Sequence, residues 1–430
     1  MTTSTHPVPG EPAWLNAEER RLVGFAAGAA VPDGFGWLDA KGGVEPDRPT
    51  ETWITARMTH VFSLAHLRGD PDAAELADHG LAALTGPLCD GDLGGWFDEV
   101  PEGGDAARVR ERSHASSGER GLPAKSAYPH AFVVLAASSA TLAARPGARD
   151  LLTRALTVFD ERFWEEEAAC VRESWDADWT ATEPYRGANS AMHWVEALLA
   201  AADATGDIRW TRRALAIAER LVHGVAAAHD WRLPEHFTPD WQPIPDYNRD
   251  QPDHPFRPFG STTGHLLEWA RLLVHLELAL ERAGEAVPAW LRTDAELLFA
   301  NAVRRGWHAD GAEGFAYTLD WEDRPVVRQR MHWVVAEATM TAWTLARRTG
   351  DQAYTEYYDR WWDYADRFHV DREHGSWRHE LDPSNRPAGS VWAGKPDVYH
   401  AYQAVLLPQV GLSTSIGAAL PATPQEGGAA

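Results

Sequence analysis

The chain has 430 residues, 44% of them hydrophobic, so it can bury a large core as one large domain or as two to three smaller ones. Its formal net charge of -23 repels phosphate backbones and anionic lipid surfaces, which argues against nucleic acid and membranes as partners. It has two cysteines, no signal-peptide pattern and no apolar stretch of about 18 residues, so we expect a soluble cytoplasmic protein without a disulfide framework.

Runs with helical periodicity fill the chain between two ends rich in Pro, Gly, Ala and Thr. We expect those ends, residues 1–12 and 413–430, to be mobile tails. The helical runs come in pairs, and turn signals separate the two members at Gly69, Pro146, Gly206, Gly284 and Gly350. A long, nearly regular period in an all-helical chain predicts stacked helical hairpins.

The first member of each pair is the more apolar, and six such runs occur, at residues 55–67, 131–144, 191–204, 266–280, 334–347 and 399–410. The runs that follow, such as residues 210–222, are amphipathic, as expected of helices with one solvent-facing side. Six buried helices with amphipathic partners predict a closed (α/α)6 barrel in a single domain over residues 13–412. An open solenoid is the alternative.

Polar and aromatic residues cluster where the six apolar runs begin. In chain order they are Trp53 and Arg57, then Lys125, Tyr128 and His130, then Asn189 and His193, then His265 and Glu268, then Trp333 and Glu337, and finally Asp397, Tyr399 and His400. In a closed barrel these starting ends meet on one face around the axis, so the sequence predicts a pocket there. Taken singly, each residue has a simpler explanation as a helix cap, a surface ion pair or core filling. The twenty-one tryptophans are equally ambiguous, because indole stacks on sugars but also fills large helical cores.

His265 and Glu268 lie three residues apart after a Pro/Gly-rich loop, so they share one face of the first turns of a helix. The amide groups of a helix start disfavour an imidazolium ion, whereas a nearby carboxylate favours it. These opposed effects would suit His265 to proton transfer near neutral pH, although a capped core histidine remains the alternative. The long loop before it, residues 233–260, is expected to cap the pocket or to form a surface hairpin.

Six segments in this order resemble the N-acylglucosamine 2-epimerase superfamily, and within it the mannose isomerases and sulfoquinovose isomerases. They are residues 53–57, 125–130, 185–193, 255–269, 333–337 and 395–400. The resemblance implies an (α/α)6 barrel that isomerises a free monosaccharide without a metal or another cofactor. By motif, His265 and His400 correspond to the two catalytic histidines. The substrate contacts implied are Trp53, Arg57, Tyr128, Asn189, His193, Glu268, Trp333 and Glu337.

Conversion of an aldose to a 2-ketose moves one proton between C2 and C1 and another between O2 and O1. It therefore needs a poised base and donors that hold the developing enediolate. We assign the carbon proton to His265, tuned by Glu268, and the ring oxygen and O1 to His400, although the sequence leaves the reverse assignment open. The preferred reaction is D-mannose to D-fructose, with D-lyxose to D-xylulose as a second pair.

Other functions fit the same residues. A sugar 2-epimerase would place the two histidines on opposite faces of C2, and a sulfoquinovose isomerase would need an additional cation. A glycoside hydrolase would need two opposed carboxyl groups. A metal-dependent isomerase would use His193, His265 and His400 as ligands, and a sugar-binding protein would do no chemistry. The sequence does not distinguish a monomer from a homo-oligomer.

Overall fold

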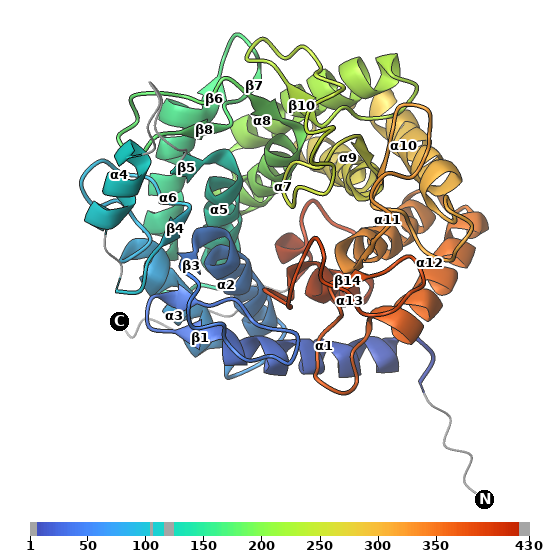
Figure 1. Ribbon diagram of the computed structural model, residues 1–430, viewed down its shortest axis with the longest axis horizontal. Coiled ribbons are helices and arrows are strands. Elements are labelled where there is room, and N and C mark those ends of the chain that lie inside the picture. The colour runs from blue at the N-terminus through green and yellow to red at the C-terminus, as the bar shows by residue number, and fades with distance from the viewer. Residues whose placement is uncertain (1–6, 104–105, 116–123, 421–430) are drawn as a thin grey trace, which may run out of the picture.

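The computed structural model describes residues 7–103, 106–115 and 124–420. Within these ranges the chain forms thirteen α-helices, joined by loops and strands of two residues. Figure 1 shows the helices arranged as two concentric rings, and the chain proceeds around them from its N-terminus to its C-terminus. No helix in the described part of the chain is long and apolar enough to cross a membrane.

The inner ring consists of α2 (Thr52–Leu67), α5 (Ala127–Leu142), α7 (Ala188–Thr205), α9 (Thr263–Ala283), α11 (His332–Thr349) and α13 (Tyr399–Val410). Each inner helix packs on the next, and α13 packs on α2, which closes the ring. Nearly all of their residues are buried, because neighbouring helices cover both flanks and an outer helix covers the back. The six predicted apolar runs and the (α/α)6 barrel are confirmed.

The outer ring consists of α3 (Ala73–Thr85), α6 (Ala148–Val158), α8 (Ile208–Ala218), α10 (Trp290–Gly306), α12 (Gln352–Tyr364) and α1 (Pro12–Ala26). Three of them continue into π-helical turns, η2 (Phe159–Phe163), η3 (Glu219–Ala226) and η4 (Ala365–His369). The sixth pair differs from the sequence pattern, because the outer partner of α13 is α1 from the other end of the chain. The N-terminal helix therefore completes the barrel. Helix α4 (Ala106–Ala115) and the 3-10 turns η1 (Ala27–Ala29) and η5 (Gly417–Ala419) lie outside this series.

Three of the predicted glycine turns end inner helices. Gly206, Gly284 and Gly350 follow α7, α9 and α11 with φ of 73°, 70° and 75°, a left-handed conformation that a Cβ atom would strain. After two of them, Asp207 and Asp351 cap the next outer helix by accepting the N–H groups of residues 209 and 353.

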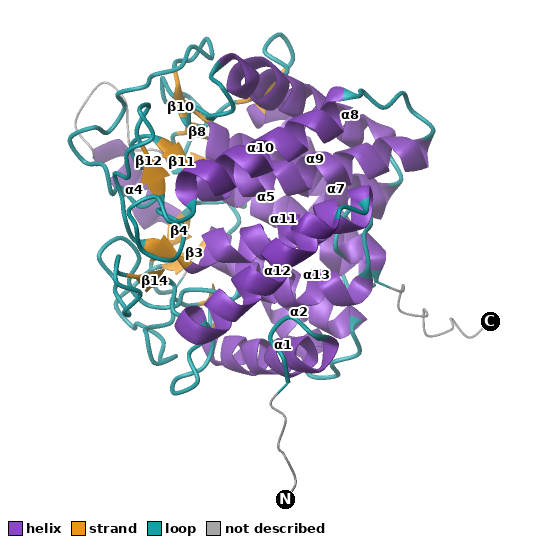
Figure 2. Ribbon diagram, turned by 90° about the vertical axis from the view of Figure 1, so that its right-hand side faces the viewer, coloured by secondary structure: helices purple, strands orange, loops and turns teal. Residues whose placement is uncertain are grey.

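Short strand pairs fix the starting ends of the inner helices. They are β3 (Thr50–Glu51) with β4 (Glu99–Val100), β5 (Lys125–Ser126) with β8 (Ser174–Trp175), β9 (Arg186–Gly187) with β10 (His236–Phe237), β11 (Ser261–Thr262) with β12 (Thr318–Leu319), and β13 (Arg330–Met331) with β14 (Glu380–Leu381). Two further pairs are local hairpins, β1 (Ala30–Val31) with β2 (Gly34–Phe35), and β6 (Trp164–Glu165) with β7 (Cys170–Val171). Figure 2 shows strands and long loops gathered at one end of the barrel. Strands of two residues are too short to show an alternating pattern in the sequence.

Two of the three lysines serve this scaffold. Lys125 Nζ lies 2.7 Å from an Asp90 carboxylate oxygen, and Lys395 Nζ lies 2.8 Å from one of Asp371. Both ammonium groups also donate to a backbone carbonyl of the same loop, that of Gly94 or Gly375. These buried ion pairs hold the loops that precede α5 and α13.

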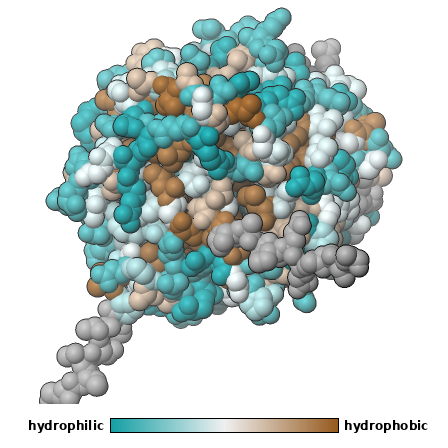
Figure 3. All heavy atoms as spheres, turned by 180° about the vertical axis from the view of Figure 1, so that it is seen from behind, coloured by the Kyte–Doolittle hydropathy of each residue, from teal (hydrophilic) through white to brown (hydrophobic). Residues whose placement is uncertain are grey.

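The segment after α13 packs against the opposite end of the barrel. The carbonyl of Ser413 accepts a 2.6 Å hydrogen bond from His275, and the hydroxyls of Thr414 and Ser415 donate to the buried Asp203 carboxylate. The expected tail from residue 413 is therefore corrected over residues 413–420, because these bonds and buried Leu420 tie it to the core. Residues 1–6 and 421–430 lie outside the described ranges. Figure 3 shows this end of the molecule, where apolar patches lie among hydrophilic side chains.

Candidate active site

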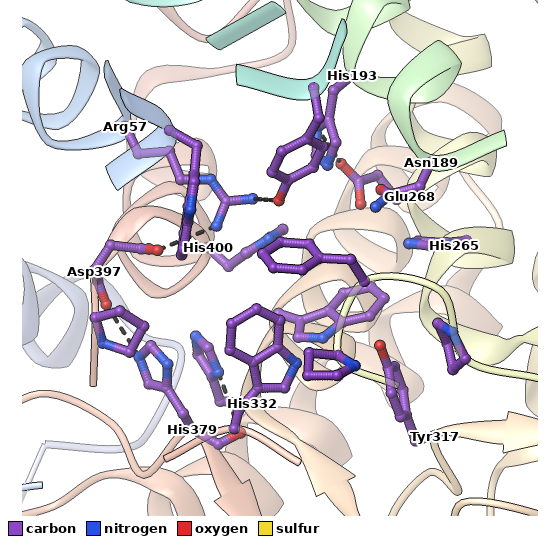
Figure 4. Close-up of a pocket in the computed structure, with 18 residues that line it drawn as sticks. Arg57, Asn189, His193, His265, Glu268, Tyr317, His332, His379, Asp397 and His400 are labelled. Atoms are coloured by element: carbon purple, nitrogen blue, oxygen red, sulfur yellow. Dashed lines mark hydrogen bonds and ion pairs between the residues drawn. The ribbon is translucent and has the colours of Figure 1, made fainter. Parts of the chain in front are cut away.

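A cavity of about 660 Å³ opens among the starting ends of the inner helices. It contains nine of the ten predicted site residues: Trp53, Arg57, Tyr128, Asn189, His193, His265, Glu268, Trp333 and His400. Figure 4 shows Arg57, Asp397 and His379 on one side of this cavity and Asn189, Glu268 and His265 on the other. Each inner helix contributes at least one lining side chain.

Arg57 is held by partners from two other segments of the chain, α5 and the start of α13. Its guanidinium donates to the Asp397 carboxylate at 3.1 Å and to the Tyr128 hydroxyl at 2.8 Å. The same group lies over the rings of Phe132 and Tyr399, at 4.3 and 4.6 Å from their centroids. The charge of Arg57 is thus fixed in position and partly balanced, while its buried Nε has no hydrogen-bond partner. A polyol oxygen is a suitable acceptor for such a group.

His265 pairs with a carboxylate that the sequence analysis did not assign. Its Nδ1 lies 2.9 Å from Glu235 Oε1, whereas no described contact joins it to Glu268. The prediction that Glu268 tunes His265 is therefore corrected: the carboxylate that binds His265 is that of Glu235. Glu235 lies immediately before β10, so helical spacing around His265 gives no signal for it.

His400 has an equivalent arrangement on α13. Its Nδ1 lies 3.1 Å from Glu337 Oε1, and Arg271 binds both oxygens of that carboxylate at 2.8 and 3.1 Å. Burial lowers the pKa of His400, an effect that Glu337 opposes. Burial alone would raise the pKa of Glu337, but the charges and hydrogen bonds of Arg271 and His400 together lower that pKa. Glu337 is fully buried behind His400 and does not line the cavity, so its predicted substrate contact is corrected to a contact with His400.

Glu268 is a buried carboxyl group whose two oxygens have no hydrogen-bond partner. Burial, reinforced by repulsion from Glu337 and Glu196, raises its pKa well above the usual range. The raised pKa favours the protonated form, which can donate a hydrogen bond into the cavity. One of its oxygens lies 3.7 Å from His193 Nδ1 and 3.8 Å from a guanidinium nitrogen of Arg271.

His193 completes this part of the wall. Its Nδ1 lies 3.4 Å from Glu196, a carboxylate that also accepts bonds from Tyr399 and Gln403. Burial lowers the pKa of His193 to about 4, so the ring is neutral. A neutral imidazole can donate or accept a bond from a sugar hydroxyl.

A stacked histidine pair forms a wall that the sequence analysis missed. The rings of His332 and His379 lie 3.7 Å apart at 19°, and burial lowers the pKa of both, to about 4 for His379. His379, Tyr317, Trp392 and Phe256 all come from the segments between helices, where helical periodicity gives no signal. Aligning the strand segments of successive hairpins would have found His379 and Tyr317, which lie just before β14 and β12.

The loop of residues 233–260 covers the cavity, as one of its two predicted roles requires. Its residues Pro255, Phe256 and Pro258 line the cavity, and the Phe256 ring meets Trp392 edge-on at 5.0 Å. His236 anchors the loop, because its Nε2 donates to the Pro258 carbonyl at 2.8 Å. The structure also brings Tyr128 to the cavity rather than His130, whose Nε2 accepts the Trp96 N–H group.

Two buried groups bring three possible metal ligands within 4.8 Å of one another, His193 with Glu196 and Glu268, and Glu268 with Glu337 and His400. Both depend on Glu268. In the second group Glu337 is already neutralised by Arg271, so a metal ion would bring a second positive charge beside that guanidinium. In the first group Glu196 already accepts two hydrogen bonds from protein side chains. These donor sets fit a metal ion poorly.

Comparisons with known proteins agree with this geometry. The model of the N-acylglucosamine 2-epimerase (GlcNAc 2-epimerase) family matches residues 34–404. A D-mannose isomerase of Thermobifida fusca is 58% identical over 410 residues, covering 95% of this chain and 96% of that protein. A D-mannose isomerase of Pseudomonas cannabina pv. alisalensis is 50% identical over 412 residues, covering 96% of each chain.

A crystal structure of a D-mannose isomerase matches with a TM-score of 0.81 and 27% identity, over 93% of this chain and 98% of that one. The closed ring of helical hairpins is thus shared with a D-mannose isomerase of known structure. The chain belongs to the N-acylglucosamine 2-epimerase family.

Proposed function

We propose that the protein is an aldose-ketose isomerase that interconverts D-mannose and D-fructose. The observation that carries this proposal is that His265 and His400 line one cavity, each with Nδ1 bound to a buried carboxylate. The Nε2 atom of each ring has no partner among the described residues and is left for substrate. The D-mannose isomerases similar to this chain support mannose as the sugar.

The reaction begins when the pyranose ring opens. We assign this step to His400, which transfers a proton between O1 and the ring oxygen. His265 then takes the proton from C2, and the electrons of that bond form the C1–C2 double bond of an enediolate. Its negative charge develops on O1, near the donors Arg57 and protonated Glu268. His400 then carries the O2 proton to O1, and His265 returns the carbon proton to C1 as the C2=O bond forms, which gives the 2-ketose.

The cavity favours a neutral sugar over a sulfonated one. Arg57 is the one lysine or arginine among the described residues that line it, and its charge is already paired with Asp397. A sulfonate would need a second cation there. Sulfoquinovose is therefore the weaker candidate, and D-lyxose with D-xylulose remains a second pair of substrates within the proposal.

The test is incubation with D-mannose in D2O, followed by NMR. Isomerisation predicts fructose, with deuterium entering at C1 to the extent that the His265 proton exchanges with solvent. Glucose without fructose would instead establish a 2-epimerase. An unchanged sugar that still binds would establish a sugar-binding protein. A parallel reaction with chelator tests the expected independence of metal, and a chromogenic mannoside tests hydrolysis.

The cavity draws on residues from Trp53 to His400, so we propose that residues 13–412 act as one catalytic domain. We also propose a cytoplasmic location, which the two free cysteines, Cys89 and Cys170, suit.

A further inference from the structure

Five hairpins of the barrel share one backbone hydrogen bond. The first residue of an inner helix donates its N–H group to the carbonyl of the residue just before the next paired strand. The donor and acceptor pairs are Thr52 with Asp98, Ala127 with Glu173, Ala188 with Glu235, Thr263 with Tyr317, and His332 with His379. Asp98, Glu173, Glu235, Tyr317 and His379 therefore occupy equivalent positions in successive repeats.

In two of these repeats the side chain caps the start of the following inner helix. Asp98 accepts the N–H and hydroxyl groups of Ser126 at 2.6 and 2.5 Å. Glu173 accepts the Gly187 N–H at 3.1 Å and the Ser190 hydroxyl at 2.9 Å. These bonds satisfy amide groups that a helix start leaves without partners.

In the next repeat the equivalent carboxylate, that of Glu235, accepts a hydrogen bond from an imidazole. Glu235 accepts the Thr262 N–H at a longer 3.4 Å and the His265 Nδ1–H at 2.9 Å. Thr262 and His265 are three residues apart, as are Gly187 and Ser190, so His265 replaces the hydroxyl that Glu173 binds. The bond that caps a helix start at Glu173 thus corresponds to a histidine-carboxylate pair at Glu235.

Glu235 differs from the carboxylate behind His400 in its charge balance. It is 4% exposed, its Oε2 has no hydrogen-bond partner, and no described arginine or lysine forms an ion pair with it. Glu337, by contrast, is bound by Arg271. Among the described residues, the ion-pair partner of Glu235 is therefore His265.

We infer that Glu235 is the positioning residue for His265, an inference that rests on the proposed isomerase function. As acceptor at Nδ1 it holds the tautomer whose Nε2 lone pair faces the cavity. When that nitrogen takes the C2 proton, the carboxylate stabilises the imidazolium that forms. The other groups around His265 are His236 beside Glu235, Glu268 on the same helix, and Tyr317 before β12. Of these, Glu268 has a raised pKa that favours its neutral form, and His236 is bound at both nitrogens.

The test compares Glu235→Gln with Glu173→Gln, which changes the equivalent carboxylate one repeat earlier and serves as the matched control. Glutamine keeps an acceptor oxygen in both places but removes the charge. For E235Q we expect kcat on mannose to fall roughly 10²- to 10³-fold with KM within about threefold. The acidic limb of its kcat/KM profile should move to lower pH, because the imidazolium loses its counter-charge. E173Q should stay within about threefold of wild type in kcat, and both variants should melt within about 5 °C of it.

A second readout does not depend on turnover. In protein labelled with ¹⁵N-histidine, the His265 resonances should report the Nδ1–H tautomer in wild type. In E235Q they should report a mixture of tautomers, because the glutamine amide can accept from Nδ1–H through its oxygen or donate to Nδ1 through its nitrogen. Equal activity of E235Q and E173Q, or an unchanged His265 tautomer in E235Q, would overturn the inference. If wild type makes no fructose, the proposed function fails, whereas the tautomer measurement still decides the role of Glu235. If E235Q does not fold, Glu235→Asp, which keeps the charge but shortens the reach, should retain the tautomer and lose less activity.

Discussion

The starting ends of α9 and α13 place two histidines in one cavity but give them different surroundings. His265 faces Glu235, which forms no ion pair with an arginine or lysine in the described part of the chain, whereas His400 faces Glu337, which Arg271 neutralises. The ring of Trp333 lies near both, with centroids 5.2 Å from His265 and 5.7 Å from His400. The same pairing of Nδ1 with a carboxylate can therefore prepare one imidazole as a base and the other as a neutral proton carrier. The two carboxylates differ in their other neighbour, which is the Arg271 guanidinium for Glu337 and the Thr262 N–H group for Glu235.

Removing either imidazole should have the largest effect. We expect His265→Asn and His400→Asn each to lower kcat/KM on mannose by about 10²- to 10⁴-fold, the usual contribution of a positioned acid or base. Deuterium exchange at C2 separates the two roles, because H400N keeps the base and should retain more exchange than H265N. Circular dichroism of both variants checks that the barrel is intact. Wild-type rates in either variant would refute the assignment of that histidine.

Glu337→Gln should have an intermediate effect of a different kind. The change leaves the fully buried guanidinium of Arg271 without its bidentate partner, which costs about 3 kcal/mol of folding free energy or more. It should also lower kcat roughly 10- to 100-fold, because Nδ1 of His400 loses its acceptor charge.

The control is the double variant Glu337→Gln with Arg271→Gln, measured by chemical denaturation and by turnover. Removing both charges should restore part of the stability but not the activity. If stability and activity returned together, Glu337 would matter only as the counter-ion of Arg271, and the parallel with Glu235 would be lost.

The sequence predicted the ring more completely than the site. Apolar periodicity located all six inner helices, because burial on every side leaves a strong pattern. It also placed nine of the ten proposed residues around the cavity, since those residues sit at helix starts. It missed Glu235, Tyr317 and His379, which lie before strands of two residues that have no pattern of their own. It misplaced Glu337, because helical spacing indicates a face of the helix but not the depth at which a side chain ends.

Several buried imidazoles away from His265 also have lowered pKa values. Burial lowers the pKa of His193 and His379, which line the cavity, and of His60 and His275, which line a second pocket beside residues 414–417, to about 4 in each case. The unfolded chain binds protons at these sites below about pH 6.5, but the folded chain does not. Stability at neutral pH should therefore be lost as the pH falls from about 6.5 toward 4.

Between pH 7 and 5.5 each such imidazole should cost about 1 kcal/mol, as measured by urea denaturation at a series of pH values. His60→Gln tests the sign, because a side chain that cannot be protonated at this position should flatten the acid limb by about that amount. A variant with the same acid dependence as wild type would show that His60 is protonated in the folded protein. That result would also weaken the view that burial keeps His400 neutral, since burial is the main cause in both.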